Sequence, residues 1–168
     1  MSQRFAKVKE EVLALIPPTI YFFVALHIVA LIRALMTKGT GIAPTSTMSI
    51  AVAALILGKS VLLADMLPAI NRYPDKPLVY NIGWKTAIYL LVALLIHYLE
   101  RLFDFARQAG GVVAGNERLF AEIVWPHFWA VQILLLVLIL MYTTTHELVR
   151  YIGKDRALQI FFGPRPGG

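Results

Sequence analysis

The sequence predicts an all-α integral membrane four-helix bundle, and three observations support this fold class. Hydrophobic residues occupy 58% of the 168 positions. Charged residues occupy only 15%, whereas about a quarter of the residues in a soluble domain are charged. The apolar residues lie in four long blocks, and each block is long enough to cross a bilayer core, which takes about 20 residues of helix.

Two further features of the composition restrict the function. Cysteine is absent, so disulfide bonds and metal sites built on cysteine are excluded. The formal net charge is +6. In a membrane protein we interpret this charge as contact with anionic lipid head groups at the cytoplasmic side, and not as nucleic-acid binding.

The apolar blocks and the polar segments between them define the expected domains. We expect a cytoplasmic segment over 1–11, a membrane domain over 12–153 and a cytoplasmic tail over 154–168. The four spans are expected at about 12–36, 48–67, 82–105 and 119–152. Pro17 and Pro18 lie near the start of the first span, where they either begin the helix after an interfacial segment or kink it.

Short polar residues and glycines mark the expected helix ends. Thr45, Ser46 or Thr47 is expected to cap the second span, and Asn81 and Asn116 the third and fourth. A glycine-rich link is expected over 108–115, and a short amphipathic segment follows the fourth span in KDRALQIFF.

The stretch from 58 to 85 is expected to join spans two and three through a short turn. Pro74 and Pro77 enclose Asp75 and Lys76, and proline restricts the backbone. A stiff, short turn is expected to hold the two spans as an antiparallel hairpin.

The distribution of basic residues predicts that both termini lie in the cytoplasm. Ten lysines and arginines fall on the termini and the second loop, against five on the other two loops. The ten are Arg4, Lys7, Lys9, Arg72, Lys76, Lys85, Arg150, Lys154, Arg156 and Arg165. Since basic residues concentrate on the cytoplasmic side, the larger group marks that side.

A shift of 68 residues aligns the first span with the third. Ile20, Tyr21 and Arg33 then meet Ile88, Tyr89 and Arg101. We treat a parallel duplication of two helix pairs as a hypothesis, because apolar helices also match by chance and spans two and four show no comparable match.

Three stretches carry a resemblance: EVLALIPPTIYFFVALH, LGKSVLLADMLPAINRYPDKPLVYNIGWKT and AGNERLFAEIVWPHFWA. Together they resemble a group of small bacterial inner-membrane proteins with four predicted spans. The resemblance covers nearly the whole chain. It implies a location in the bacterial inner membrane and a multi-pass topology, and it implies no activity and no site residues.

Two histidines suggest a cofactor as an alternative. His27 and His97 each lie about fifteen residues into a span, which corresponds to a similar depth of about 22 Å. Two histidines on facing helices can ligate the iron of a b-type haem. The competing interpretation is that each histidine hydrogen-bonds a neighbouring helix or lies near the membrane interface, and we favour this one and expect no cofactor.

A second group of polar residues is expected near the outer ends of the spans: Glu100, Asp104, Glu122 and His127. Carboxylates and histidines from several helices can hold a pair of metal ions. The paired Glu-x-x-His motif of such sites is absent, so ion pairs with Arg101 and Arg107 are the favoured interpretation, and no metal site is predicted.

The polar residues expected inside the membrane are Lys59, Asp65, Gln132, His146 and Glu147. Lys59 lies near mid-span, where a lysine usually faces a bundle interior or extends its ammonium group toward the head groups. Glu147 or His146 is its expected partner, with Gln132 an alternative. A polar path through Lys59 is the basis of a second alternative, conduction or transport.

No nucleophile elbow, phosphate-binding loop, zinc-protease motif or nucleotide fingerprint is present. The favoured function is therefore that of a non-enzymatic membrane subunit or scaffold that binds partner membrane proteins, lipid or its own copies. Small residues on the second span, such as Ala54 and Gly58, would permit the close helix approach that such binding uses.

Overall fold

The computed structural model describes residues 2–38, 46–70, 72–73 and 76–163, with side chains from residue 13 onward. In these ranges the protein is all-helical. The six helices are α1 (Ser2–Met36), α2 (Thr47–Asp65), α3 (Leu78–Ala109), α4 (Val112–Ala121), α5 (Trp125–Ile152) and α6 (Lys154–Phe162). Helices α1, α2, α3 and α5 are long and apolar enough to cross a membrane, which confirms the four predicted apolar helices.

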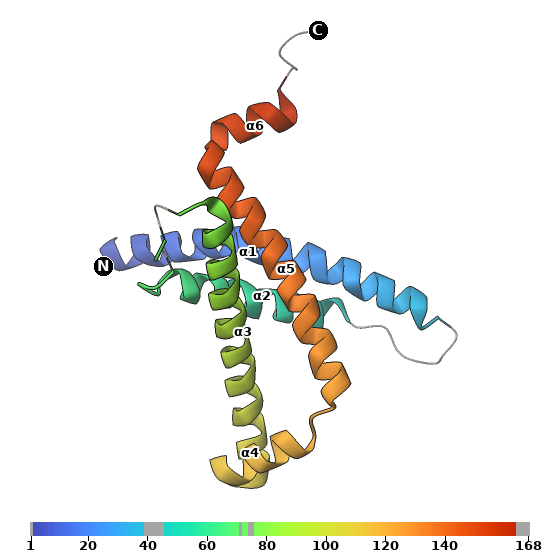
Figure 1. Ribbon diagram of the computed structural model, residues 1–168. Helices are drawn as coiled ribbons and strands as arrows, with labels where there is room; N and C mark the ends of the chain where they lie inside the picture. The colour runs from blue at the N-terminus through green and yellow to red at the C-terminus, as the bar shows by residue number, and fades with distance from the viewer. Residues whose placement is uncertain (1, 39–45, 71, 74–75, 164–168) are drawn as a thin grey trace.

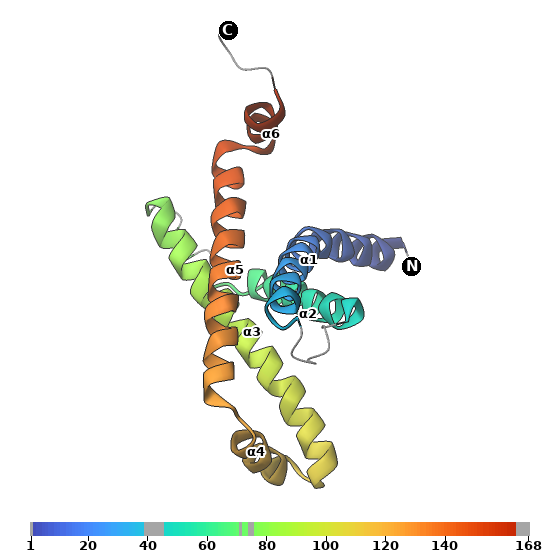
Figure 2. The same ribbon diagram turned by 90° about the vertical axis from the view of Figure 1, so that its right-hand side faces the viewer.

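The four long helices pack as a bundle of two pairs. Helices α1 and α2 run antiparallel side by side, as do α3 and α5, and the two pairs cross steeply (Figures 1 and 2). Helix α2 therefore contacts α3 but crosses it, and the expected antiparallel hairpin of spans two and three does not form. Pro74 and Asp75 of the expected turn lie outside the described residues.

The core lies where the two pairs cross. Its buried residues come from four helices and the segment after α2, and they are Phe22, Ala54, Leu57, Val61, Ala64, Ile70, Tyr89, Ala93, Leu138 and Ile139. On α2 the buried residues Ala54, Leu57, Val61 and Ala64 recur at alternating spacings of three and four, which places them on one face of the helix. The Tyr21 hydroxyl donates to the Leu138 carbonyl at 3.0 Å, which ties α1 to α5.

Helices α1 and α2 approach closely at one glycine. A Cβ atom at Gly58 would lie 3.2 Å from the Thr19 Cα atom and would overlap Thr19 Oγ1. The absence of a side chain at Gly58 therefore permits the approach. Helix α1 is therefore the antiparallel neighbour of α2, whereas the sequence predicted α3 as that neighbour.

Helix α2 begins with a capping serine, whereas α3 begins directly after a proline. Ser46 caps α2 by accepting a hydrogen bond from the Ser49 amide at 3.2 Å, which confirms one of the three predicted caps. The predicted cap at Asn81 is wrong, because α3 begins at Leu78 directly after Pro77. Proline suits this place since its fixed φ leads into a helix and it lacks an amide hydrogen to satisfy.

The predicted fourth helix over 119–152 is divided into α4 and α5. Helix α5 starts at Trp125 with Pro126 in its first turn, where proline is favoured and a continuous helix would be interrupted. The expected link over 108–115 is much shorter, because α3 ends at Ala109, just before Gly110 with φ +78°, and α4 begins at Val112. Asn116 does not cap a helix; its side chain accepts a hydrogen bond from the Tyr98 hydroxyl at 2.9 Å.

The first and last helices complete the architecture. Helix α1 includes both Pro17 and Pro18, so the chain does not begin its helix at these prolines, and Figure 2 shows the two halves of α1 at an angle to each other. Helix α6 is the predicted short segment after the last span. The duplication stays a hypothesis: both halves contain an antiparallel pair, but only the second contains an inserted helix, α4.

Candidate functional site

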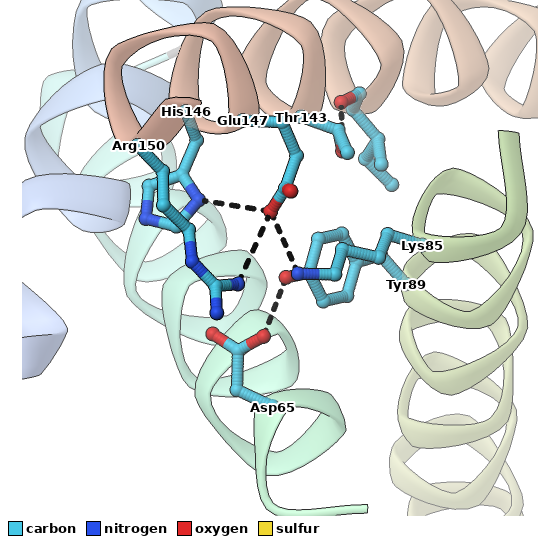
Figure 3. A network of polar contacts seen from close by, with 8 residues as sticks. Asp65, Lys85, Tyr89, Thr143, His146, Glu147 and Arg150 are labelled. Atoms are coloured by element: carbon cyan, nitrogen blue, oxygen red, sulfur yellow. Dashed lines mark hydrogen bonds and ion pairs between the residues drawn. The ribbon is translucent and has the colours of Figure 1, made fainter. Parts of the chain in front are cut away.

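The polar side chains of three helices meet near the C-terminal ends of α2 and α5 and the beginning of α3. Figure 3 shows this polar network, which we define as Asp65, Lys85, Tyr89, Thr143, His146, Glu147 and Arg150. Asp65 is the last residue of α2, Lys85 and Tyr89 lie on α3, and the other four lie on the second half of α5. The network thus joins both helix pairs.

A buried ion pair is the centre of the network. Nζ of Lys85 donates to Oε1 of Glu147 at 2.6 Å, and the two side chains are only 5% and 6% exposed. Removing two charges from water is costly, and their attraction offsets this cost only when the geometry is good. The short distance and the mutual burial meet that requirement and fix α3 against α5.

Two other side chains of α5 approach Glu147 less closely. His146 Nδ1 lies 3.7 Å and an Arg150 guanidinium nitrogen 3.8 Å from Oε1 of Glu147, and both side chains are at least half exposed. The His146 ring stacks on Tyr142 with 5.7 Å between the ring centroids. Figure 3 shows the Arg150 guanidinium pointing into the space between Glu147 and Asp65. The carboxylates of Glu147 and Asp65 therefore lie next to the basic side chains of Lys85 and Arg150.

Tyr89 connects the network to α2. Its hydroxyl donates a hydrogen bond to Oδ1 of Asp65, and its ring is 2% exposed in the core. Lys85 and Tyr89 are four residues apart and so lie on one face of α3. One face of α3 thus binds α5 through Lys85 and α2 through Tyr89.

Hydroxyl groups are buried in the bundle at Thr19, Ser60, Thr86 and Thr143. Ser60 and Thr143 each donate to the carbonyl four residues earlier on their own helices, at 2.8 Å. The hydroxyl oxygens of Thr19 and Thr86 are buried without a hydrogen-bond partner in the part of the chain that the structure describes. Thr19 is the residue that contacts Gly58, so its hydroxyl lies within the α1–α2 interface.

The structure gives Glu147 a different partner from the expected Lys59. Lys59 is exposed on α2, while Glu147 binds Lys85. Sequence reasoning missed Lys85 and Tyr89 because it placed the helix start at 82, which left Lys85 at the interface. Since α3 begins at Leu78, Lys85 lies two turns inside the helix, about 10 Å along its axis. Pro77 was the signal for the earlier start.

The expected haem ligands lie on α1 and α3, whose backbones do not pack directly against each other over the described residues. His27 Nδ1 is 2.8 Å from the Phe23 carbonyl oxygen, and its ring packs on Phe23. His97 is exposed on α3. The hydrogen bond of His27 is therefore within its own helix, and the b-type haem stays an untested alternative.

The four expected outer-side residues are not brought together into one site. Glu122 pairs with Arg118 at 2.9 Å, and Glu100, Asp104 and His127 are exposed. Among the described side chains, no group of three or more His, Cys, Asp or Glu residues could hold a metal ion. Arg107 lies over the Phe103 ring at 4.4 Å, a cation–π contact where an ion pair was expected.

Gln132, the remaining candidate, is half-buried on the first half of α5.

Comparisons of the chain with protein-family models, curated proteins and solved structures found no match. The resemblance to small bacterial inner-membrane proteins with four predicted spans stays a prediction, and the geometry alone supports a functional proposal.

The Tyr89 hydrogen bond can be tested by itself. Tyr89→Phe keeps the buried ring and removes only the hydroxyl group that binds Asp65. We expect a loss of about 1–2 kcal/mol in unfolding free energy, because the bond is charge-assisted but exposed Asp65 regains water. The measurement is an unfolding titration in mixed micelles. Tyr80→Phe, at an exposed position of α3, is the control and should have no effect; equal effects of the two changes would contradict the assignment.

Proposed function

We propose that this chain is a non-enzymatic, multi-pass membrane subunit or scaffold that binds partner membrane proteins, lipid or its own copies. One observation carries the proposal: the buried charged side chains are bonded to each other, and the outward side chains of the long helices are large and apolar. Exposed examples are Ile28, Leu31, Leu55, Leu91, Leu95, Ile133 and Met141. Apolar surface of this extent is typical of contact with lipid or with other apolar helices.

The chemistry of the polar network supports a structural role for it. An ionisable residue inside a membrane protein usually marks a functional path or binds a partner residue. Here Lys85 and Glu147 neutralise each other, and Tyr89 binds Asp65. The four side chains connect α2, α3 and α5, and we infer that they fix the relative positions of these helices and so the shape of the outer surface.

We further propose a location in the bacterial inner membrane with both termini in the cytoplasm. When the buried Lys85 is left out, nine lysines and arginines remain on the termini and the second loop, against five on the other two loops. This distribution still favours the cytoplasmic side for the termini. The network joins the end of α2, the start of α3 and the end of α5, as the proposal requires of helix ends on one side of the membrane.

The topology can be tested with single cysteines, since the chain has none of its own. Glu117 on α4 and Asp155 on α6 are both exposed. In intact cells a membrane-impermeant maleimide should label Glu117→Cys, after passage through the outer membrane, and should label Asp155→Cys only after the inner membrane is opened. The reverse pattern would contradict the proposed orientation.

The binding role can be tested by native mass spectrometry of protein extracted with its surrounding lipid. The chain alone has a mass of 18.8 kDa. We expect a larger assembly, with further copies, a second protein or retained lipid in a fixed ratio. A bare single chain that keeps neither protein nor lipid under gentle conditions would contradict the proposal.

The variant Glu147→Ala, analysed in the same way, tests the link between the network and the binding surface. If the network fixes the shape of that surface, the variant should lose part of the assembly even where it remains inserted. An exposed change such as Glu117→Ala is the matched control and should leave the assembly intact.

A further inference from the structure

Helix α6 begins immediately beyond the last long apolar helix. Helix α5 ends at Ile152, and α6 starts at Lys154. Gly153 lies between them with φ +92°, a conformation that favours glycine. Both views show α6 leaving the axis of α5 at an angle (Figures 1 and 2). If α5 crosses a bilayer, which is part of the proposed function, α6 starts at the membrane boundary.

The sequence of α6 gives it two different faces. At 100° per residue, Leu158 and Phe161 lie close together on one side of the helix with Ala157, and Lys154 falls on the same side one turn earlier. Asp155, Arg156 and Gln159 lie on the other side, where Ile160 is next to Arg156. Ala157 is buried, but Leu158 is 58% and Phe161 77% exposed, so the side that carries them is open.

Basic residues outnumber acidic ones on α6. Lys154 and Arg156 are accompanied by a single acidic residue, Asp155. Tyr151, next to Arg150, is 81% exposed, and tyrosine is enriched at the membrane–water interface. An amphipathic helix with basic residues and phenylalanine, adjacent to a span, has the properties of a helix that lies in the interface.

We propose that α6 lies in the head-group layer of an anionic bilayer leaflet. Leu158 and Phe161 enter the boundary of the acyl chains, and Lys154 and Arg156 contact lipid phosphate groups. Continuity with α5 favours lipid over a protein partner, because a nine-residue helix one residue beyond a span cannot move far from the bilayer surface. The basic residues select anionic over zwitterionic lipid.

The test uses the full chain in vesicles, with one cysteine at a time labelled with the environment-sensitive fluorophore NBD. Labels at Leu158 and Phe161 report the apolar face, and labels at Asp155 and Gln159 report the polar face. A label at Leu136, exposed on α5, reports the span itself. Vesicles of phosphatidylcholine with phosphatidylglycerol are compared with vesicles of phosphatidylcholine alone, and lipids with a doxyl quencher on the acyl chain show direct contact with lipid.

In anionic vesicles we expect blue-shifted emission at Leu158 and Phe161, with doxyl quenching several-fold stronger than at Asp155 and Gln159. In phosphatidylcholine alone, or with Lys154 and Arg156 both changed to glutamine, this difference should shrink markedly. Equal quenching in both lipids would overturn the assignment of anionic selectivity, and with it the proposal.

Two other outcomes would also overturn the proposal and are distinguishable. If the labels at Leu158 and Phe161 are in water while the label at Leu136 is in lipid, α6 does not lie in the membrane. That result would contradict the placement of α6 but not the proposed function. Blue-shifted α6 labels that the doxyl lipids do not quench would indicate a protein contact, such as a second copy. An aqueous label at Leu136 would contradict the spanning role of α5 and thus the proposed function itself.

Discussion

Glu147→Ala is expected to lower the unfolding free energy by about 3–5 kcal/mol, the largest effect of any single change considered for this protein. The variant leaves Lys85 as a buried cation, 4% exposed as a residue, whose ammonium group has lost the carboxylate 2.6 Å away. Arg150 and His146 cannot compensate, since they would add positive charge. The measurement is an unfolding titration in mixed micelles, followed by helical circular dichroism.

The matched control replaces both partners. Lys85→Met with Glu147→Leu keeps apolar volume at both positions and leaves neither charge behind, so its stability should lie within about 1–2 kcal/mol of the wild type. Each single change should lower the unfolding free energy much more than the double change does, which gives a large coupling energy in the double-mutant cycle. Single changes that are mild and simply additive would show that the two side chains do not interact.

Gly58→Ala is expected to cost about 1–3 kcal/mol, since the added methyl group overlaps Thr19 Oγ1 and lies 3.2 Å from Thr19 Cα. Both residues lie in helices, so the overlap forces α1 and α2 apart. Gly83→Ala is the control, because a Cβ atom there has no neighbour within 4 Å and should be neutral or slightly stabilising.

Thr19→Ala provides a rescue for the same contact. It removes the overlapping oxygen, which is also a buried hydroxyl without a partner in the described part of the chain. Combined with Gly58→Ala, it should restore much of the lost stability in the same titration. A double variant no more stable than Gly58→Ala alone would contradict the close approach of the two helices at this point.

The apolar blocks were sufficient to predict the four long helices, because the length and hydropathy of each block can be read directly from the sequence. The helix ends depended on single residues. Ser46 could be predicted as a cap because a short polar side chain preceded an apolar block. Pro77 precedes the first residue of α3 and Pro126 lies in the first turn of α5, and neither was used as a start signal. The predicted starts at 82 and 119 were therefore misplaced.

The site could be predicted only in part, because it depends on which helix faces meet. Asp65, His146 and Glu147 were identified as polar residues within apolar helices, but their partners Lys85 and Tyr89 were not. Periodicity does not specify which of two antiparallel helices a third one contacts. The steep crossing of the pairs and the close approach at Gly58 decide that. Gly58 indicated a close approach in the sequence, but the sequence did not indicate which helix would approach there.

The most direct test of the central claim, that the charges inside the membrane domain are used as helix–helix contacts, is solid-state NMR on the protein in lipid bilayers. With ¹⁵N-lysine and ¹³C-glutamate labelling, the account predicts strong dipolar coupling between Lys85 Nζ and the Glu147 carboxylate carbon, lost in Lys85→Met. The 2.6 Å contact between Nζ and Oε1 requires this coupling. No such coupling in the wild type, or one that persists in Lys85→Met, would contradict the account.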